Sequence, residues 1–162
     1  MPTLDVTKIY EGLYQGAWPP FGNELARRGF EVVVLCANEN QHEDMYHDIQ
    51  VICAPGDDDA RVNRMMRFLP TWIAAARRTA VLLEKGKKVL VTCMAGLNRS
   101  GMVTAMALHL VTGWSGDEIV EHMQSARANA LCNETFANWI RENLKESEEP
   151  ELPEVLETPE AG

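Results

Sequence analysis

The sequence predicts an α/β fold with a mostly parallel central sheet flanked by helices, and three observations lead to it. Three short runs of β-branched and apolar residues lack polar alternation, as expected of strands covered on both faces. They span residues 30–37, 49–55 and 87–92. Helical patterns lie between and after them, an alternation typical of parallel sheets. The length of 162 residues, 46% of them hydrophobic, fits one domain with a sizeable core.

Two further elements are indicated in the first half of the chain. The segment KIYEGLYQG, residues 8–16, is a weaker candidate for a strand or hairpin. Residues 70–86 predict an amphipathic crossover helix that begins at Pro70, where a first turn tolerates proline, and ends at Gly86. Its apolar face carries Trp72, Ala76, Ala80 and Leu83.

Three helices are predicted in the second half. Residues 101–111 are apolar almost all round, which indicates a helix buried through the middle of the fold. Ser115 and Glu118 form a capping box that begins the next helix. The last helix follows Asn133, since apolar residues then recur at four-residue steps, at Phe136, Ile140 and Leu144.

The formal net charge of -9 is unevenly distributed. Residues 147–162 carry six Glu and no Lys or Arg, so the rest of the chain is nearly balanced. This tail is rich in Pro and Glu and poor in apolar residues, and we expect it to be disordered. The acidic total argues against non-specific binding to nucleic acid or to an anionic membrane.

The chain shows neither a signal peptide nor an apolar run long enough to span a membrane, so we expect a cytoplasmic protein. Its four cysteines lie far apart without a CxxC pair, which indicates reduced thiols rather than disulfides or zinc. The four histidines give no metal-ligand spacing. We therefore expect no metal and no cofactor.

The stretch VTCMAGLNRSG, residues 91–101, carries the chemistry. Cys93 stands where a strand should end, and a helix should begin near Ser100. Backbone N–H groups of the intervening loop then point inward at the positive end of a helix, which suits a phosphate dianion. Arg99 adds a planar fork that can hold two phosphate oxygens. The expected phosphate-binding residues are Met94, Ala95, Gly96, Leu97, Asn98 and Arg99.

The same loop predicts a reactive thiol. A cysteine at a helix N-terminus beside a cation ionises readily, so Cys93 is the expected nucleophile. Ser100 can donate a hydrogen bond to the sulfur, Gly96 allows a tight turn, and Gly101 allows close helix packing. A buried structural cysteine with an arginine six positions later by chance is the alternative. The two glycines, the serine and the strand, loop and helix context favour the functional interpretation.

At this motif the sequence resembles cysteine-dependent phosphatases of the dual-specificity class, whose signature is Cys, five residues, Arg, then Ser or Thr. Residues 9–16, 30–40 and 125–140 are similar to the opening strand, the second strand and the closing helical segment of that class. The resemblance implies a compact dual-specificity phosphatase-like catalytic domain over residues 1–146, followed by the acidic tail. It also implies two-step hydrolysis of phosphate esters without metal.

The resemblance further implies a general acid, an aspartate on the loop before the crossover helix. The segment APGDDDA occupies that place and offers Asp57, Asp58 and Asp59. Asp58 is favoured, then Asp57, and clustered like charges help one of them keep a proton. A solvated acidic turn is the alternative. Thr92 departs from the family, which usually has His before the cysteine.

The expected substrates are phosphorylated proteins or peptides, with phosphotyrosine and phosphoserine or phosphothreonine both accepted in a shallow pocket. The loop has no Lys, which disfavours inositol lipids. Asn98 before Arg99 also resembles RNA 5′-triphosphatases, and Arg61, Arg64 and Arg67 could bind additional phosphates or simply be solvated. A 5′-phosphorylated RNA is thus the one nucleic acid considered, and no membrane partner is expected.

Two further classes remain as alternatives. A phosphopeptide-binding pseudophosphatase would retain the grip on phosphate without turnover, although the retained cysteine, arginine and acids argue against it. A rhodanese-like sulfur transferase also uses a loop cysteine but has a different loop pattern. Cys53 could form a protective disulfide with Cys93, but core packing is the favoured interpretation for Cys53, Cys36 and Cys132.

Overall fold

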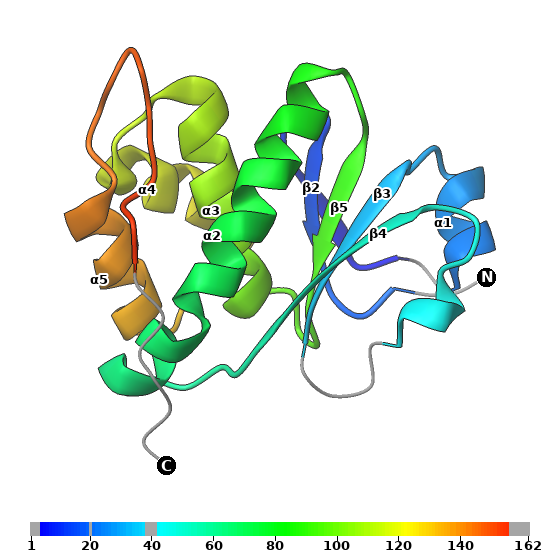
Figure 1. Ribbon diagram of the computed structural model, residues 1–162, viewed down its shortest axis with the longest axis horizontal. Helices are drawn as coiled ribbons and strands as arrows, with labels where there is room; N and C mark the ends of the chain where they lie inside the picture. Colours follow the sequence, from blue (N-terminus) through cyan, green and yellow to red (C-terminus); the bar gives the residue numbers. More distant parts are fainter. Residues whose placement is uncertain (1–3, 20, 38–41, 156–162) are drawn as a thin grey trace.

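The computed structural model describes residues 4–19, 21–37 and 42–155. Its centre is a five-stranded sheet in the order β1-β2-β5-β3-β4 (Figure 1). β1 pairs antiparallel with β2, and the other three pairings are parallel, so the predicted mostly parallel sheet is confirmed. The strands are β1 (Val6–Tyr10), β2 (Leu13–Gly16), β3 (Val32–Ala37), β4 (Gln50–Gly56) and β5 (Val89–Thr92).

Helices cover both faces of this sheet. Four helices pack on one face, where the larger apolar cluster lies (Figure 1). They are α2 (Val62–Glu84), α3 (Arg99–Thr112), α4 (Gly116–Ala126) and α5 (Glu134–Asn143). The short helix α1 (Gly22–Arg27) and the 3₁₀ turn η1 (Glu43–Met45) lie on the other face, around a smaller cluster that includes Leu25 and Tyr46. In the described residues no helix combines the length and hydropathy needed to cross a membrane.

Most predicted elements are present with nearby boundaries. The 8–16 segment forms the β1–β2 hairpin, and α3 is buried from Arg99 to His109. Ser115 accepts the N–H of Glu118 at 3.2 Å and caps α4. Asn133 caps α5 in the same way. α1 and η1 were not predicted, because elements of six and three residues are too short to show a periodic pattern.

The start of α2 corrects one expectation. The helix begins at Val62, so Pro70 lies in its interior rather than in its first turn. Proline there removes one backbone hydrogen bond. The residues before it bury Met65 and Leu69 in the main core, and this packing outweighs the local cost. Because α2 begins at Val62, the acidic stretch 57–59 lies directly before its first turn.

The first part of the acidic tail also differs from the expectation of disorder. Residues 147–155 turn back over the helical layer (Figure 1), and the N–H of Ser147 donates to the Gly113 carbonyl at 3.0 Å. Leu152 is 6% exposed and belongs to the main core, with Val155 packed against it. Two apolar residues among the glutamates anchor the segment. The average composition of the tail does not reveal them, because it is dominated by Glu and Pro. The rest of the predicted tail, residues 156–162, lies outside the described residues.

Replacing Leu152 with alanine is expected to lower the free energy of unfolding by about 2 kcal/mol, the lower end for a buried leucine because a chain near its terminus relaxes easily. Urea unfolding followed by circular dichroism measures it. The exposed neighbour supplies the control, since Glu151→Ala should change stability very little. Equal stability of both variants with the wild-type protein would show that the segment is not anchored.

Candidate active site

The cysteine loop lies between the central strand β5 and the buried helix α3. β5 is hydrogen-bonded on both sides, to β2 and to β3, so the position of Cys93 directly after Thr92 is rigidly set. Gly96 has a φ of 71°, a left-handed conformation that glycine adopts without strain. A Cβ on Gly96 would also overlap the backbone of Gly16 at the end of β2. Both facts explain why a glycine stands in the middle of the loop.

All four carbonyl groups from Met94 to Leu97 accept hydrogen bonds from outside the loop. The donors are Trp18 N–H to Met94 (3.2 Å), Arg127 Nη2 to Ala95 (3.2 Å), Gln15 Nε2 (3.0 Å) and Arg127 Nε (2.8 Å) to Gly96, and Leu131 N–H to Leu97 (3.0 Å). In a planar trans peptide the N–H points opposite to the C=O. The N–H groups of residues 95–98 therefore point to the inside of the loop.

Arg127, the residue directly after α4, braces the loop from outside. Its side chain is 6% exposed, and its Nη1 and Nη2 each lie 2.9 Å from a carboxylate oxygen of Asp5. Arg127 was not predicted as a site residue, because no local motif distinguishes it from surface arginines. Gln15 was not predicted either, although a glutamine beside apolar residues near the end of a predicted strand is an unusual feature.

The predicted nucleophile, arginine and serine are brought together. Cys93 is 3% exposed, and its Sγ lies 3.3 Å from the Ser100 Oγ. Arg99, the first residue of α3, is 7% exposed and donates from Nη1 to the Gly56 carbonyl at 3.2 Å. Gly56 ends β4 directly before the acidic stretch. The guanidinium thus links the cysteine loop to the loop that carries the aspartates.

Asp58 is in direct contact with the cysteine loop. One carboxylate oxygen accepts from Asn98 Nδ2 at 2.9 Å, and the other from Asn133 Nδ2 at 2.9 Å. Asn98 in turn accepts the backbone N–H of Asn133 at 2.8 Å. Three segments far apart in the sequence therefore meet at one carboxyl group beside the loop.

The two flanking aspartates form ion pairs with arginines. Asp57 lies 2.8 Å from Arg64 Nη2 in α2. Asp59 lies 2.7 Å from Arg61 Nη2, and hydrogen bonds from Arg61 lower the pKa of Asp59 to about 2. A carboxyl group with that pKa is ionised at neutral pH and holds no proton to donate. Two of the three predicted basic residues are thus engaged with the acidic stretch.

Thr92, which stands in place of the family's usual histidine, is bonded to the neighbouring strand β3. Its hydroxyl donates to the Val34 carbonyl of β3 at 2.9 Å. Gln15 and Arg127 contact the loop carbonyls and brace the loop.

The expectation that the other three cysteines pack in the core holds for Cys36 but not for Cys53 and Cys132. Cys36 is fully buried, and burial raises its pKa well above the ordinary value. Because Leu35 pairs with Thr92 in the sheet, Cys36 is the thiol on the strand position next to Cys93. Cys53 and Cys132 are exposed, so the core interpretation is wrong for both.

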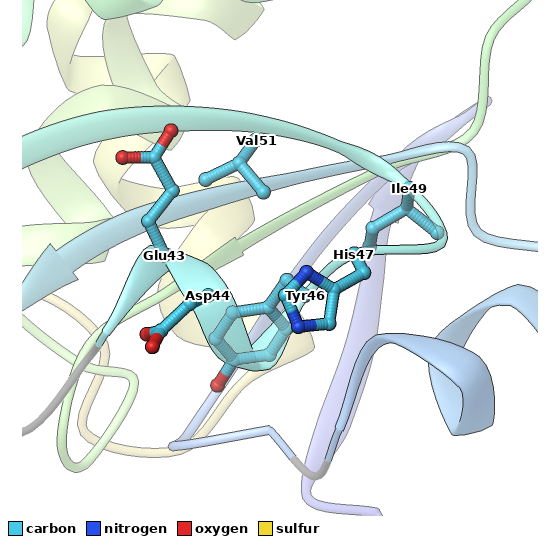
Figure 2. Close-up of a pocket in the computed structure, with 6 residues that line it drawn as sticks. All are labelled: Glu43, Asp44, Tyr46, His47, Ile49 and Val51. Carbon is cyan, nitrogen blue, oxygen red and sulfur yellow. The ribbon is translucent and has the colours of Figure 1, made fainter.

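A hollow of about 500 Å³ lies elsewhere, between η1 and the start of β4 (Figure 2). Its lining includes Glu43, Asp44, Tyr46 and His47. None of its lining residues belongs to the cysteine loop or to the acidic stretch. A ring of N–H groups around a phosphate needs little volume. The hollow beside η1 is therefore not the candidate active site.

The sequence model of the family described as dual specificity phosphatase, catalytic domain, matches residues 13–146, which is most of the chain. The chain belongs to this family. It is a dual-specificity phosphatase, with the fold that the sequence resemblance implied. Curated protein sequences give no match to the chain.

Solved structures agree with the fold of this phosphatase. Human DUSP28 has a TM-score of 0.70 at 20% identity, covering 88% of this chain and 93% of its own. A mouse putative dual specificity phosphatase, complexed with zinc tungstate, has a TM-score of 0.69 at 19% identity and covers 87% of this chain and 89% of its own. Tk-PTP in the active form has a TM-score of 0.67 at 23% identity, covering 85% and 97%.

Proposed function

We propose that this phosphatase hydrolyses phosphate monoesters on tyrosine and on serine or threonine of proteins, through a phosphocysteine intermediate at Cys93. The observation that carries the proposal is the outward engagement of the four loop carbonyls. It leaves a set of inward N–H groups at the helix N-terminus, above the sulfur, as a site for a dianion. Arg99 at the end of the loop adds the cationic fork.

In the first step the Cys93 thiolate attacks phosphorus and the bond from phosphorus to the substrate oxygen breaks. The departing oxygen takes the electron pair and a proton from a general acid. Asp58 suits this role because its carboxyl group contacts the loop residue Asn98 at 2.9 Å. Asp59, ionised beside Arg61, is the least suited of the three. Inward N–H groups and Arg99 stabilise the charge on the transferred phosphoryl group.

In the second step water attacks the phosphocysteine. Asp58, now deprotonated, takes the proton of the water, while the bond between sulfur and phosphorus breaks and the thiolate re-forms. The Ser100 hydroxyl, 3.3 Å from Sγ, donates a hydrogen bond to the departing sulfur. Inorganic phosphate is released, and every group returns to its starting protonation state.

The proposed substrates are proteins rather than RNA ends. A polyphosphate end needs cations beyond the loop, and the arginines nearest the acidic stretch, Arg61 and Arg64, are paired with Asp59 and Asp57. Tungstate, which the mouse structure contains, is a tetrahedral oxyanion like phosphate and serves as an inhibitor to test the site. Reduced thiols and a cytoplasmic location stay predictions.

Four substrates test the proposal: p-nitrophenyl phosphate, a phosphotyrosyl peptide, a phosphothreonyl peptide and triphosphate-ended RNA. We expect release of phosphate from the first three, with inhibition by tungstate, and little release from the RNA. Phosphate release assays give kcat/KM for each. Faster release from the RNA would replace the protein assignment by the RNA one. Binding of the peptides without any release would indicate a pseudophosphatase.

A further inference from the structure

Gln15 places a buried amide directly beneath the cysteine loop. The side chain is fully buried at the end of β2. Its Nε2 lies 3.0 Å from the Gly96 carbonyl, 3.2 Å from the Ser100 Oγ and 3.4 Å from the Leu97 carbonyl. Carbonyl oxygens only accept, so the amide atom that faces them must be the nitrogen. The orientation of the Gln15 amide is thereby fixed.

The oxygen of the Gln15 amide lowers the stability of the fold. Its Oε1 is buried and has no hydrogen-bond partner in the described part of the chain. A buried acceptor without a partner destabilises a fold, and an apolar side chain of the same length would avoid that. The unpartnered Oε1 therefore offsets part of the stability that the Nε2 contacts contribute.

Of the three atoms that Nε2 contacts, only Ser100 depends on it. The Gly96 carbonyl also accepts from Arg127 Nε at 2.8 Å, and the Leu97 carbonyl from the Leu131 N–H at 3.0 Å. Within the described residues the Ser100 Oγ has two neighbours at hydrogen-bond distance, Gln15 Nε2 and Cys93 Sγ. The neutral Cys93 thiol donates to this oxygen, but a thiolate only accepts. Once Cys93 is ionised, the hydroxyl oxygen accepts from Gln15 and its own hydrogen is directed to the sulfur.

We propose that Gln15 is a positioning residue that orients the Ser100 hydroxyl toward Cys93 for the second step of the reaction. This inference rests on the proposed function. When the bond between sulfur and phosphorus breaks, the electron pair returns to sulfur, and the oriented O–H stabilises it without transferring its proton.

Gln15→Met keeps the length of the side chain and removes the donor. We expect kcat for p-nitrophenyl phosphate to fall about tenfold, the scale for one hydrogen bond to a charged group. KM should fall by the same factor, leaving kcat/KM within about twofold, since kcat/KM reports only the steps up to phosphoenzyme formation. Rapid-quench experiments should show more trapped phosphocysteine in the variant than in the wild type.

Ser100→Ala supplies the partner for a double-mutant cycle. We expect Ser100→Ala to show the same split between kcat and kcat/KM, and the double variant to be no slower than Ser100→Ala alone, because Gln15 acts through Ser100. Thr79→Val is the matched control. Thr79 is also fully buried, but it bonds to Ala75 within α2, away from the loop. This variant should keep both kcat and KM.

Several outcomes would overturn the proposal. Parallel losses of kcat/KM, kcat and melting temperature in Gln15→Met would show a structural role, as would failure of both Gln15→Met and Gln15→Leu to fold. Additive effects in the double variant would show that Gln15 does not act through Ser100. If the wild-type protein turns over substrate and Gln15→Met has the same kcat and KM, the role of Gln15 is rejected while the proposed function stands. Absence of wild-type turnover would reject the proposed function together with it.

Discussion

Cys93→Ser is expected to reduce phosphate release to the background rate, a loss on the order of 10⁴-fold or more for removal of a nucleophile. A serine hydroxyl ionises far less readily than a thiol, so the loop would hold phosphate above a group that does not attack it. The N–H groups and Arg99 are unchanged, and tungstate binding should therefore persist. Phosphate release and isothermal titration with tungstate measure the two effects.

The matched control for this prediction is another thiol of the same chain. Cys53 is exposed on β4, away from the loop, and Cys53→Ser should keep wild-type turnover and stability. Turnover in Cys93→Ser at more than a few per cent of the wild-type rate would reject Cys93 as the nucleophile. Loss of tungstate binding along with activity would instead indicate that the loop had collapsed.

Asp58→Asn is expected to lower kcat by about 10²-fold or more, the usual contribution of a general acid. The loss should be largest for a phosphothreonyl peptide, whose alkoxide leaving group needs the proton most. It should be smaller for p-nitrophenyl phosphate, because that leaving group departs readily as an anion. Steady-state kinetics on the two substrates give the comparison directly.

Asp59→Asn provides the contrast on the same loop. The pKa of Asp59, lowered to about 2 by Arg61, keeps this carboxyl group ionised at neutral pH, so its amide variant removes an ion pair but no proton donor. We expect less than about a threefold change in kcat and the same ratio between the two substrates as in the wild type. Equal losses in the Asp58 and Asp59 variants would defeat the assignment of the acid.

The pairing pattern of the three aspartates shows what the sequence left open. Asp57, Asp58 and Asp59 are consecutive and chemically identical, so a one-dimensional pattern ranks them only by position. Their partners come from elsewhere: Arg64 from α2, Arg61 from the start of α2, and Asn98 with Asn133 from the cysteine loop and α5. Only the tertiary structure separates one acid beside the loop from two acids held in ion pairs.

The chain itself determined its strands, most of its helices and the loop from Cys93 to Arg99, because these depend on short-range periodicity and on one local motif. It could not determine that α2 begins before Pro70, that Leu152 returns to the core, or that Gln15 and Arg127 support the loop from below and outside. Those features arise from contacts between segments up to 122 positions apart. Such contacts depend on how the whole chain packs, so a local sequence pattern does not predict them.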